Sequence, residues 1–460
     1  MRALFGARRL AIDAPFCKLK FAFRAPLYET MDTFLPRFAY LILFCEVCFG
    51  KSIKRGKGLP EAARAFIMDR MGSDSNKEQL HIAMIGHKHV PSREGGVEVV
   101  VWELARRLRE RGFRVDCYNR NGYHMSRKDY DTVPGLPGGY RDGIRILTIP
   151  TVKNGKLNAI VYSVFATVRA VFGHYDVIHF HAEGPCLMLW LPKLCGIPVV
   201  ATIHGLDWDR AKWGNFASRM LKRGEAIAAK HADAVIVLSR SVQDYFLKTY
   251  GRETQLIPNG ISRPMKRAPR RIVEKFGLQG GDYIMTLSRI VPEKGIHYLL
   301  EAYAGIESDK KLVIVGGYSY AKDYMDEIHT LAKKDPRVIL TGWESGEELE
   351  ELMSNPYLFV LPSDLEGMSV SLLEEMSYGQ CCLVSDIPEN TDVVGEHAPT
   401  FHRGDADDLR KKLRELLEHP DQVQRYRDGA ADYICGRYSW DRMTDETVKV
   451  YREAISKKKR

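Results

Sequence analysis

Long apolar runs are missing from this sequence of 460 residues. The most apolar stretch, residues 38–45, is far shorter than the roughly 20 residues of a membrane-spanning helix, and Arg37 and Glu46 flank it. The opening residues also lack the apolar core and the small-residue cleavage site of a signal peptide. We therefore expect a cytoplasmic protein that does not cross a membrane.

Cysteine shows no pattern that would indicate disulfides or a metal site. The nine cysteines form an odd set without repeated spacing, and Cys45 and Cys48 have no second Cys or His pair to complete a zinc site. Cys381 and Cys382 lie in an apolar run, where free cysteine packs as a small apolar residue. We expect a reduced protein and assign these cysteines no chemistry.

The dinucleotide-binding fingerprint is absent as well. Residues 86–98 follow an apolar stretch, and Gly95 and Gly96 directly precede a helical pattern, but the spacing is not G-x-G-x-x-G. This absence argues against a nicotinamide-dependent oxidoreductase. A Gly pair at a helix start can bring backbone amides close to a phosphate or a sugar, although such a pair is more often only a turn.

Length and composition favour two soluble domains. The chain exceeds the size of one compact core, and its apolar and charged fractions of 45% and 28% are typical of a globular protein. The formal charge is +9, and residues 1–78 hold 14 Lys and Arg against 8 Asp and Glu. A basic surface suits an anionic partner, whether a membrane, a nucleic acid or a phosphorylated lipid, or it is only a solvated face. We expect no nucleic-acid partner.

Residues 1–78 are expected to form an N-terminal extension. Aromatic and basic residues mix in residues 15–57, so this stretch could lie on a membrane as an amphipathic segment. A packed helical extension, or sequence upstream of a true start at Met71, explains the pattern equally well.

Residues 79–262 are predicted to form a Rossmann-like α/β domain. Helical patterns separate short apolar strands, which we expect at residues 81–86, 113–118, 177–181, 199–203 and 234–238. This alternation is typical of a doubly wound parallel sheet. The pattern breaks near residues 256–261, before a stretch rich in Pro and Arg, and we place the domain boundary there.

The alternation restarts in residues 263–440, which predict a second Rossmann-like domain. Strands are expected at residues 283–287, 312–315, 338–340, 358–361 and 382–384. Helices are expected after Gly295, from Ser369 through Met376, and in the last residues of the chain. The fold class is therefore α/β, with two such domains.

Loops after strands are the places to search for a site, because parallel sheets bind ligands beyond the carboxyl ends of their strands. The loop at residues 287–295 carries Arg289 and Lys294 beside a predicted helix start. Two cations and a helix N-terminus suit a diphosphate, and would stabilise the charge that accumulates on it as it leaves. Two solvated basic residues are the alternative.

The segment at residues 363–374 carries two carboxylates, Glu366 in the predicted loop and Glu374 in the predicted helix. A carboxylate accepts paired hydrogen bonds from neighbouring hydroxyls, so one could hold a transferred sugar and the other a ribose. Paired acids also occur in hydrolases, but a hydrolase needs no separate diphosphate site. Glu374 could also be an exposed helix residue.

The segments SRIVPEKG, IPNGI and SDLEGMSVSLLEEMSYGQCCLVSD resemble the shared motifs of family 4 retaining glycosyltransferases of the GT-B fold. The segments GHKHVPSREGGVEVVVWELARRLRERGFRV, VIHFH and ATIHG resemble a bacterial branch that includes rhamnosyltransferases and other polysaccharide-assembly enzymes. The resemblance covers residues 81 to about 452. It implies two Rossmann-like domains facing a cleft, with residues 441–460 forming a helix that returns to the first domain.

The resemblance also implies roles for individual residues. Arg289 and Lys294 would hold the diphosphate, Glu374 the nucleotide ribose, and Glu366 the hydroxyls of the donor sugar. His204 would lie near the transferred sugar. The other donor contacts that the resemblance implies are Gly95, Gly96, Gly367, Met368 and Ser369.

The predicted reaction is transfer of a hexosyl or deoxyhexosyl group from a nucleoside diphosphate sugar to a hydroxyl of a lipid-linked or growing glycan, with retention of configuration. The resemblance implies no metal and no cofactor, because Arg289 and Lys294 take the place that magnesium has elsewhere. The basic extension would keep the enzyme at the inner face of the cell membrane.

Some positions depart from the pattern of the family. Glu94 and Val97 flank the Gly pair where that branch often has aromatics, and Met368 stands where many members have Phe, so donor and acceptor stay open. His179 and His181 alternate on a strand, and at least one of them could be only a satisfied strand residue. The alternative function is a catalytically silent sugar-nucleotide-binding or scaffold protein of the same fold.

Overall fold

The computed structural model of the chain describes residues 79–121, 131–132, 139–152, 155–209, 215–317 and 322–459. The expected extension at residues 1–78 lies outside the described residues, and so does the amphipathic segment predicted within it.

The first sheet consists largely of parallel strands, in the order β3-β4-β5-β2-β1-β6-β7-β8-β9. All five strands that we predicted for this part of the chain are present, because their residues are apolar enough to be buried on both faces. The strands are β1 (His81–Ile85), β2 (Arg114–Arg120), β3 (Asp131–Thr132), β4 (Gly139–Arg141), β5 (Ile144–Ile149), β6 (Val177–His181), β7 (Val199–Ile203), β8 (Ala234–Val237) and β9 (Gln255–Leu256).

The antiparallel edge of this sheet was not predicted. β4 pairs antiparallel with both β3 and β5. Asp142 and Gly143 connect β4 to β5, with left-handed φ values of 51° and 74°. An Asp-Gly pair with this conformation is typical of a two-residue hairpin turn, so this pair is the signal that would have identified the hairpin.

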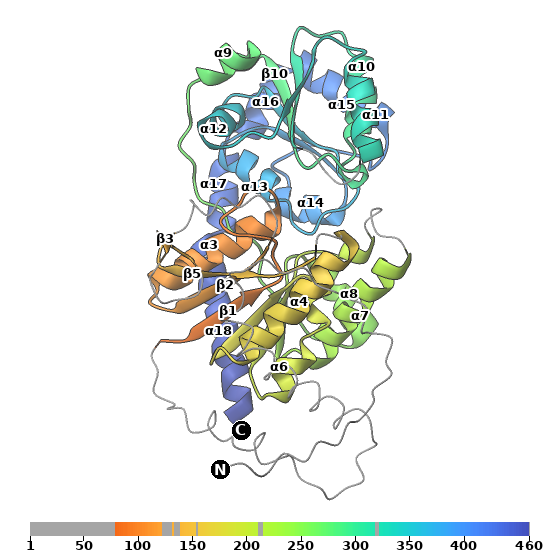
Figure 1. Ribbon diagram of the computed structural model, residues 1–460. Coiled ribbons are helices and arrows are strands. Elements are labelled where there is room, and N and C mark those ends of the chain that lie inside the picture. The colour runs from red at the N-terminus through yellow and green to blue at the C-terminus, as the bar shows by residue number, and fades with distance from the viewer. Residues whose placement is uncertain are drawn as a thin grey trace, which may run out of the picture. The chain divides into compact units, whose positions relative to one another are not determined.

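Two helices far apart in the sequence, α3 and α18, share one apolar core with the first sheet (Figure 1). Tyr451 of α18 contacts the sheet directly, because its hydroxyl lies 2.7 Å from Nδ1 of His179. The last helix therefore returns to the first sheet, as the resemblance implied. The helices of this part are α3 (Gly96–Glu110), α4 (Gly155–Val171), α5 (Glu183–Cys186), α6 (Trp190–Leu194), the 3₁₀ turn η2 (Asp207–Asp209), α7 (Asn215–His231), α8 (Arg240–Tyr250) and α18 (Trp440–Lys459).

The second sheet is parallel throughout, in the order β12-β11-β10-β13-β14-β15. The five strands predicted for this part are present, and the short edge strand β15 is an addition. The strands are β10 (Tyr283–Leu287), β11 (Lys311–Val315), β12 (Val338–Gly342), β13 (Leu358–Leu361), β14 (Cys382–Ser385) and β15 (Thr400–Phe401).

Helices cover both faces of the second sheet, and each face has its own apolar core (Figure 1). One core contains residues of α12, α13 and α17, and the other contains residues of α10, α11 and α15. The two sheets, each packed against helices, form two Rossmann-like domains and confirm the predicted α/β fold class. The helices are α9 (Arg271–Phe276), the 3₁₀ turn η3 (Pro292–Lys294), α10 (Ile296–Ala304), α11 (Lys322–Ala332), α12 (Gly346–Ser354), α13 (Val370–Ser377), α14 (Pro388–Val394), α15 (Ala406–Glu418), α16 (Pro420–Arg427) and α17 (Ala430–Arg437).

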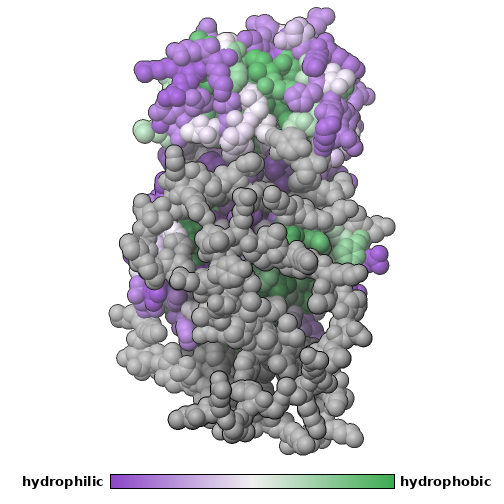
Figure 2. All heavy atoms as spheres, in the orientation of Figure 1, coloured by the Kyte–Doolittle hydropathy of each residue, from purple (hydrophilic) through white to green (hydrophobic). Residues whose placement is uncertain are grey.

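The visible surface of the part that carries α9 to α15 is mostly hydrophilic (Figure 2). A few large apolar side chains have high exposure, among them Phe216 and Trp343, which are 69% and 48% exposed. Within the described ranges, no helix is both long enough and apolar enough to cross a membrane.

Glu375 in α13 is a buried carboxyl group. Neither of its carboxylate oxygens has a hydrogen-bond partner among the described residues. Burial raises the pKa of Glu375 well above its usual range. The folded chain therefore keeps a proton that the unfolded chain has released, and the free energy of unfolding falls as pH rises from the ordinary carboxyl range toward the raised pKa.

We predict that Glu375→Leu raises the free energy of unfolding near neutral pH by about 1–3 kcal/mol, because it removes a buried polar group that has no partner. It should also flatten the fall in stability with pH. The measurement is urea unfolding from about pH 5 to about pH 8, with Glu307→Leu at an exposed glutamate as the control. An unchanged pH dependence in Glu375→Leu would contradict the prediction.

Candidate active site

The carboxyl ends of β10 and β13 form the centre of the candidate site. These strands are neighbours, with β11 and β12 on one side and β14 and β15 on the other. Open α/β sheets bind ligands at the point where the strand order reverses in this way. The loop after β10 carries Arg289 and Lys294, and the loop after β13 carries Glu366, so the fold brings these three predicted residues to the same end of the sheet.

Gly295 lets the two loops pack against each other. It adopts a φ of +62°, and a Cβ atom there would lie 2.0 Å from the carbonyl oxygen of Pro362. The backbone amide of Asp364 also donates to the carbonyl oxygen of Glu293 at 2.9 Å. Any side chain at Gly295 would push the loops apart, so this contact sets the position of Lys294 relative to Glu366.

Lys294 and Glu366 form an ion pair between the two loops, and their side chains are only 13% and 7% exposed. The hydroxyl of Ser363 donates to the same oxygen of Glu366, Oε1, at 2.7 Å. Burying a carboxylate this far from water is costly unless it has such partners. This end of the sheet therefore offers a cation and a hydroxyl-binding carboxylate side by side.

Arg289 lies close to a second cation from the other sheet. Lys88 follows β1, where the strand order of the first sheet also reverses. Burial lowers the pKa of Lys88, and the positive charge of Arg289 adds to this effect. Two cations from the two sheets near one another favour an anion with more than one charge.

The loop after β13 touches the loop after β7. A Cβ atom at Gly367 would lie 1.6 Å from the carbonyl oxygen of His204, so only glycine fits at this contact. The next residue, Met368, accepts a hydrogen bond at Sδ from the backbone amide of Asn259 at 3.2 Å. Ser369 then caps α13, because its hydroxyl accepts from the backbone amide of Leu372 at 3.3 Å.

Glu374 forms an ion pair with Arg93, a residue that was not predicted. Arg93 lies in the loop before α3 and is 48% exposed, whereas Glu374 in α13 is 14% exposed. Burial raises the pKa of Glu374, and Arg93 counteracts this. Glu374 is therefore not a solvated helix residue.

The two predicted glycines have different surroundings. A Cβ atom at Gly95 would lie 2.5 Å from Oε2 of Glu98, which folds back so that Oε1 accepts from the amide of Lys88 at 2.9 Å. A Cβ atom at Gly96 would lie 3.5 Å from Cγ2 of Val370 in α13. Gly95 therefore makes room for Glu98, and Gly96 lies against the helix that carries Glu374.

The histidines at the ends of β6 and β7 have distinct environments. His179 contacts Tyr451 and Thr202 through its two ring nitrogens, each at 2.7 Å, and burial lowers its pKa to about 3, so it is a satisfied strand residue. Nδ1 of His181 lies 3.1 Å from Nε2 of His204.

In the described part of the chain, no group of three His, Cys, Asp or Glu side chains could hold a metal ion.

Glu183 holds the loop that carries His204, and it too was not predicted. It is fully buried, and Oε1 accepts from the backbone amide of Asp207 at 2.9 Å. The preceding residue, Ala182, has a φ of 70°, which is rare for a residue with a side chain and marks a strained connection. Nothing in the sequence near Ala182 signals this conformation.

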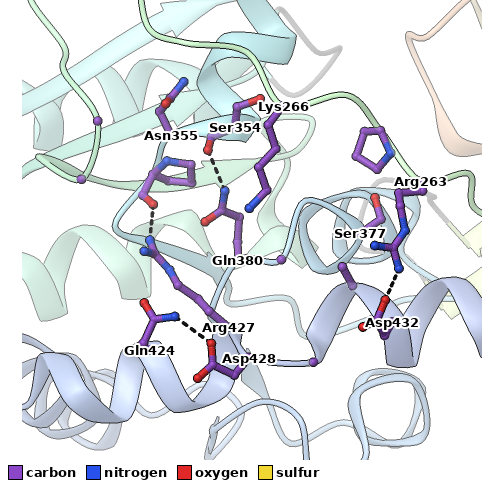
Figure 3. Close-up of a pocket in the computed structure, with 17 residues that line it drawn as sticks. Arg263, Lys266, Ser354, Asn355, Ser377, Gln380, Gln424, Arg427, Asp428 and Asp432 are labelled. Atoms are coloured by element: carbon purple, nitrogen blue, oxygen red, sulfur yellow. Dashed lines mark hydrogen bonds and ion pairs between the residues drawn. The ribbon is translucent and has the colours of Figure 1, made fainter.

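Neither of two pockets in the described part of the chain is lined by Arg289, Lys294 or Glu366. One of about 420 Å³ borders Gly367 and Met368 and has further walls from residues 238–240, α14 and the start of α18. Another of about 620 Å³ lies at the amino ends of β10, β13 and β14, where Lys266, Gln380 and Arg427 line it (Figure 3). None of the predicted site residues lines this second pocket. It lies at the amino ends of the strands, opposite the carboxyl ends that carry the predicted site residues, so we do not place the site there.

Comparison with known proteins identifies the family. The model of "Glycosyltransferase Family 4" matches residues 94–263, and that of "Glycosyl transferases group 1" matches residues 270–432. The chain therefore belongs to the family 4 glycosyltransferases of the GT-B fold. It is a glycosyltransferase, which confirms the class predicted from the motifs.

Individual relatives are distant. An α-maltose-1-phosphate synthase of Mycolicibacterium smegmatis is 24% identical over 405 residues, which cover 81% of this chain and 99% of that protein. The UDP-Gal:α-D-GlcNAc-diphosphoundecaprenol α-1,3-galactosyltransferase of Escherichia coli is 28% identical over 271 residues, which cover 55% of this chain and 69% of that protein.

Solved structures show the same fold. Sucrose-phosphate synthase from Thermosynechococcus elongatus has a TM-score of 0.70 at 19% identity, and the match covers 82% of this chain and all of that one, 100%. Anabaena Alr3699/HepE, in complex with UDP-glucose, has a TM-score of 0.66 at 17% identity, covering 81% of this chain and 100% of that one.

We predict that Gly367→Ala lowers the turnover of the enzyme at least about tenfold, because the added methyl group forces the loops after β7 and β13 apart and displaces groups that must be placed within an ångström. The measurement is the initial rate of nucleotide release. Gly436→Ala is the matched control, since a Cβ atom there meets nothing within 4 Å. Wild-type turnover in Gly367→Ala would show that the contact does not matter.

Proposed function

We propose that the protein moves a hexosyl or deoxyhexosyl group from a nucleoside diphosphate sugar to a hydroxyl of a lipid-linked or growing glycan, with retention of configuration and without a metal ion. The observation that carries the proposal is the buried Lys294–Glu366 pair at the carboxyl ends of β10 and β13, with Arg289 in the same loop as Lys294. The complex of HepE with UDP-glucose and the diphosphoundecaprenol-linked acceptor named for the Escherichia coli relative support the two substrate classes.

The donor would lie mainly on residues 263–440. Arg289 and Lys294 would hold its diphosphate and neutralise the charge that develops as the sugar leaves, which stabilises the transition state more than the bound donor. Glu366 would accept hydrogen bonds from the sugar hydroxyls and Glu374 from the ribose. The loop of Gly95 and Gly96 would approach the phosphates, and Gly367, Met368 and Ser369 would line the donor.

The acceptor would lie on residues 79–262, with residues 441–460 packed behind them. His204 would lie near the transferred sugar, at the end of the loop that Glu183 holds. The departing phosphate would take the proton of the acceptor hydroxyl on the same face of the sugar, so no separate general base is needed. Contact between the loops at Gly367 and His204 would help to exclude water and limit hydrolysis.

The test of the reaction is the release of free nucleoside diphosphate from a panel of nucleotide sugars, with and without a membrane-lipid extract. We expect release from one donor, faster with the extract, and at least about a hundredfold slower in Lys294→Ala and Glu374→Ala, because each loses a group that stabilises the donor or its leaving charge. Lys412→Ala, on the outer surface of α15, is the control.

The outcomes separate the two candidate functions. Tight donor binding without turnover under any acceptor condition would favour a catalytically silent binding protein. Loss of turnover with a chelator would contradict the proposed independence from metal. The anomeric configuration of the product, read by NMR, would decide between retention and inversion.

The basic extension is proposed to hold the enzyme at an anionic membrane. We predict that the full chain binds vesicles containing anionic lipid and that a chain lacking residues 1–70 does not, because this segment carries most of the excess positive charge. Co-sedimentation with anionic and with neutral vesicles measures this. A folded, shortened chain that still binds fully to anionic vesicles would rule out the anchor.

A further inference from the structure

The Arg93–Glu374 ion pair connects the loop before α3 to the helix that is proposed to hold the nucleotide. Residues next to this ion pair also bring the loop and the helix together. Gly96, three residues after Arg93, lies against Val370, which is one helical turn before Glu374. The loop of Arg93 therefore rests along the same face of α13 that Glu374 occupies.

This contact conflicts with the role proposed for Glu374. A carboxylate that accepts two hydrogen bonds from ribose hydroxyls must turn its oxygens to the ribose, and here Arg93 Nη2 is bonded to Oε1. A ribose that uses both oxygens of Glu374 therefore competes with Arg93 for Oε1. The displacement is feasible, because the Arg93 side chain is 48% exposed and an exposed guanidinium is readily rehydrated.

A displaced Arg93 needs another anion close by. The second carboxylate that influences Arg93 is Glu103 of α3, but it already bonds to Arg107 and Arg106. The proposed diphosphate would lie near Arg289 and Lys294, and the start of α3 is linked to this region, because Glu98 accepts from the amide of Lys88 and the charge of Arg289 acts on Lys88. Guanidinium groups bind phosphate oxygens through two parallel hydrogen bonds, which makes the diphosphate a better partner than Glu103.

We propose that Arg93 is a further donor-binding residue: it leaves Glu374 when the nucleotide ribose arrives and then binds the diphosphate. The inference rests on the proposed function, because it assumes that Glu374 takes the ribose. In this exchange, the ribose and the diphosphate of the donor have opposite effects on Arg93. The ribose competes with Arg93, and the diphosphate attracts it.

Arg93→Gln tests this exchange, because it should change the affinities for two ligands in opposite directions. The probes are uridine, thymidine, guanosine and adenosine and their diphosphates, measured by calorimetry on the full chain. For the base that binds the wild type, we expect Arg93→Gln to bind the nucleoside roughly threefold more tightly, since the competitor is gone. It should bind the nucleoside diphosphate roughly tenfold more weakly, since a charge-assisted contact is lost.

Two further variants sharpen the result. Arg93→Lys keeps the charge and should recover part of the affinity for the diphosphate. Arg414→Gln, at an exposed arginine of α15, should leave both affinities unchanged. Thermal unfolding of each variant shows whether the fold is intact.

The outcomes distinguish this inference from the proposed function. If Arg93→Gln changes both affinities in the same direction, or neither, Arg93 does not exchange between the two groups, although the enzyme still binds its nucleotide. If the wild type binds none of the diphosphates, both the inference and the proposed donor are overturned.

Discussion

The site depends on one constraint, which is that a carboxylate removed from water must have a positively charged or hydrogen-bonding partner. The side chains of Glu366 and Glu374 are only 7% and 14% exposed, and both are already paired, with Lys294 and Arg93. A ligand that binds these carboxylates must replace contacts that they already make with Lys294 and Arg93. The binding free energy is then the difference between two sets of contacts, so selectivity comes from how well the new set replaces the old one.

Close contacts between backbone segments fix the positions of the loops that carry the site residues. The carbonyl oxygen of Pro362 lies where a side chain at Gly295 would be, and the carbonyl oxygen of His204 lies where a side chain at Gly367 would be. Gly86, at the end of β1, meets the carbonyl oxygen of His181 in the same way. Backbone contacts are stiffer than contacts between long side chains, so loops with irregular conformations can still hold the site residues in a defined arrangement.

Much of the fold could be predicted from the sequence, because the strands of both sheets are short, apolar and separated by helical patterns. The same rule that directs ligands to strand ends predicted that Lys294 and Glu366 lie in loops after strands, but their direct pairing across 72 residues was not predicted. Arg93 could not be found in this way, since its partner Glu374 lies 281 residues away and an arginine before a Gly pair has no distinctive pattern. The strain at Ala182 and the burial of Glu183 depend equally on tertiary packing. The roles of the site residues stay predictions.

The connections between the two sheets lie next to each other. The chain leaves the first sheet after β9 and returns to it through α18, and these two crossings meet where Ile261 and Ser439 form a parallel bridge. A Cβ atom at Gly260 would lie 2.2 Å from the backbone nitrogen of Trp440, so the strands of this crossing are in direct contact. These crossings add to the contacts that the two halves make elsewhere, where Gly367 meets His204 and Arg93 meets Glu374. A side chain at Gly260 would therefore force the outgoing and the returning chain apart, and would change how the two halves are held without altering any residue assigned to the donor.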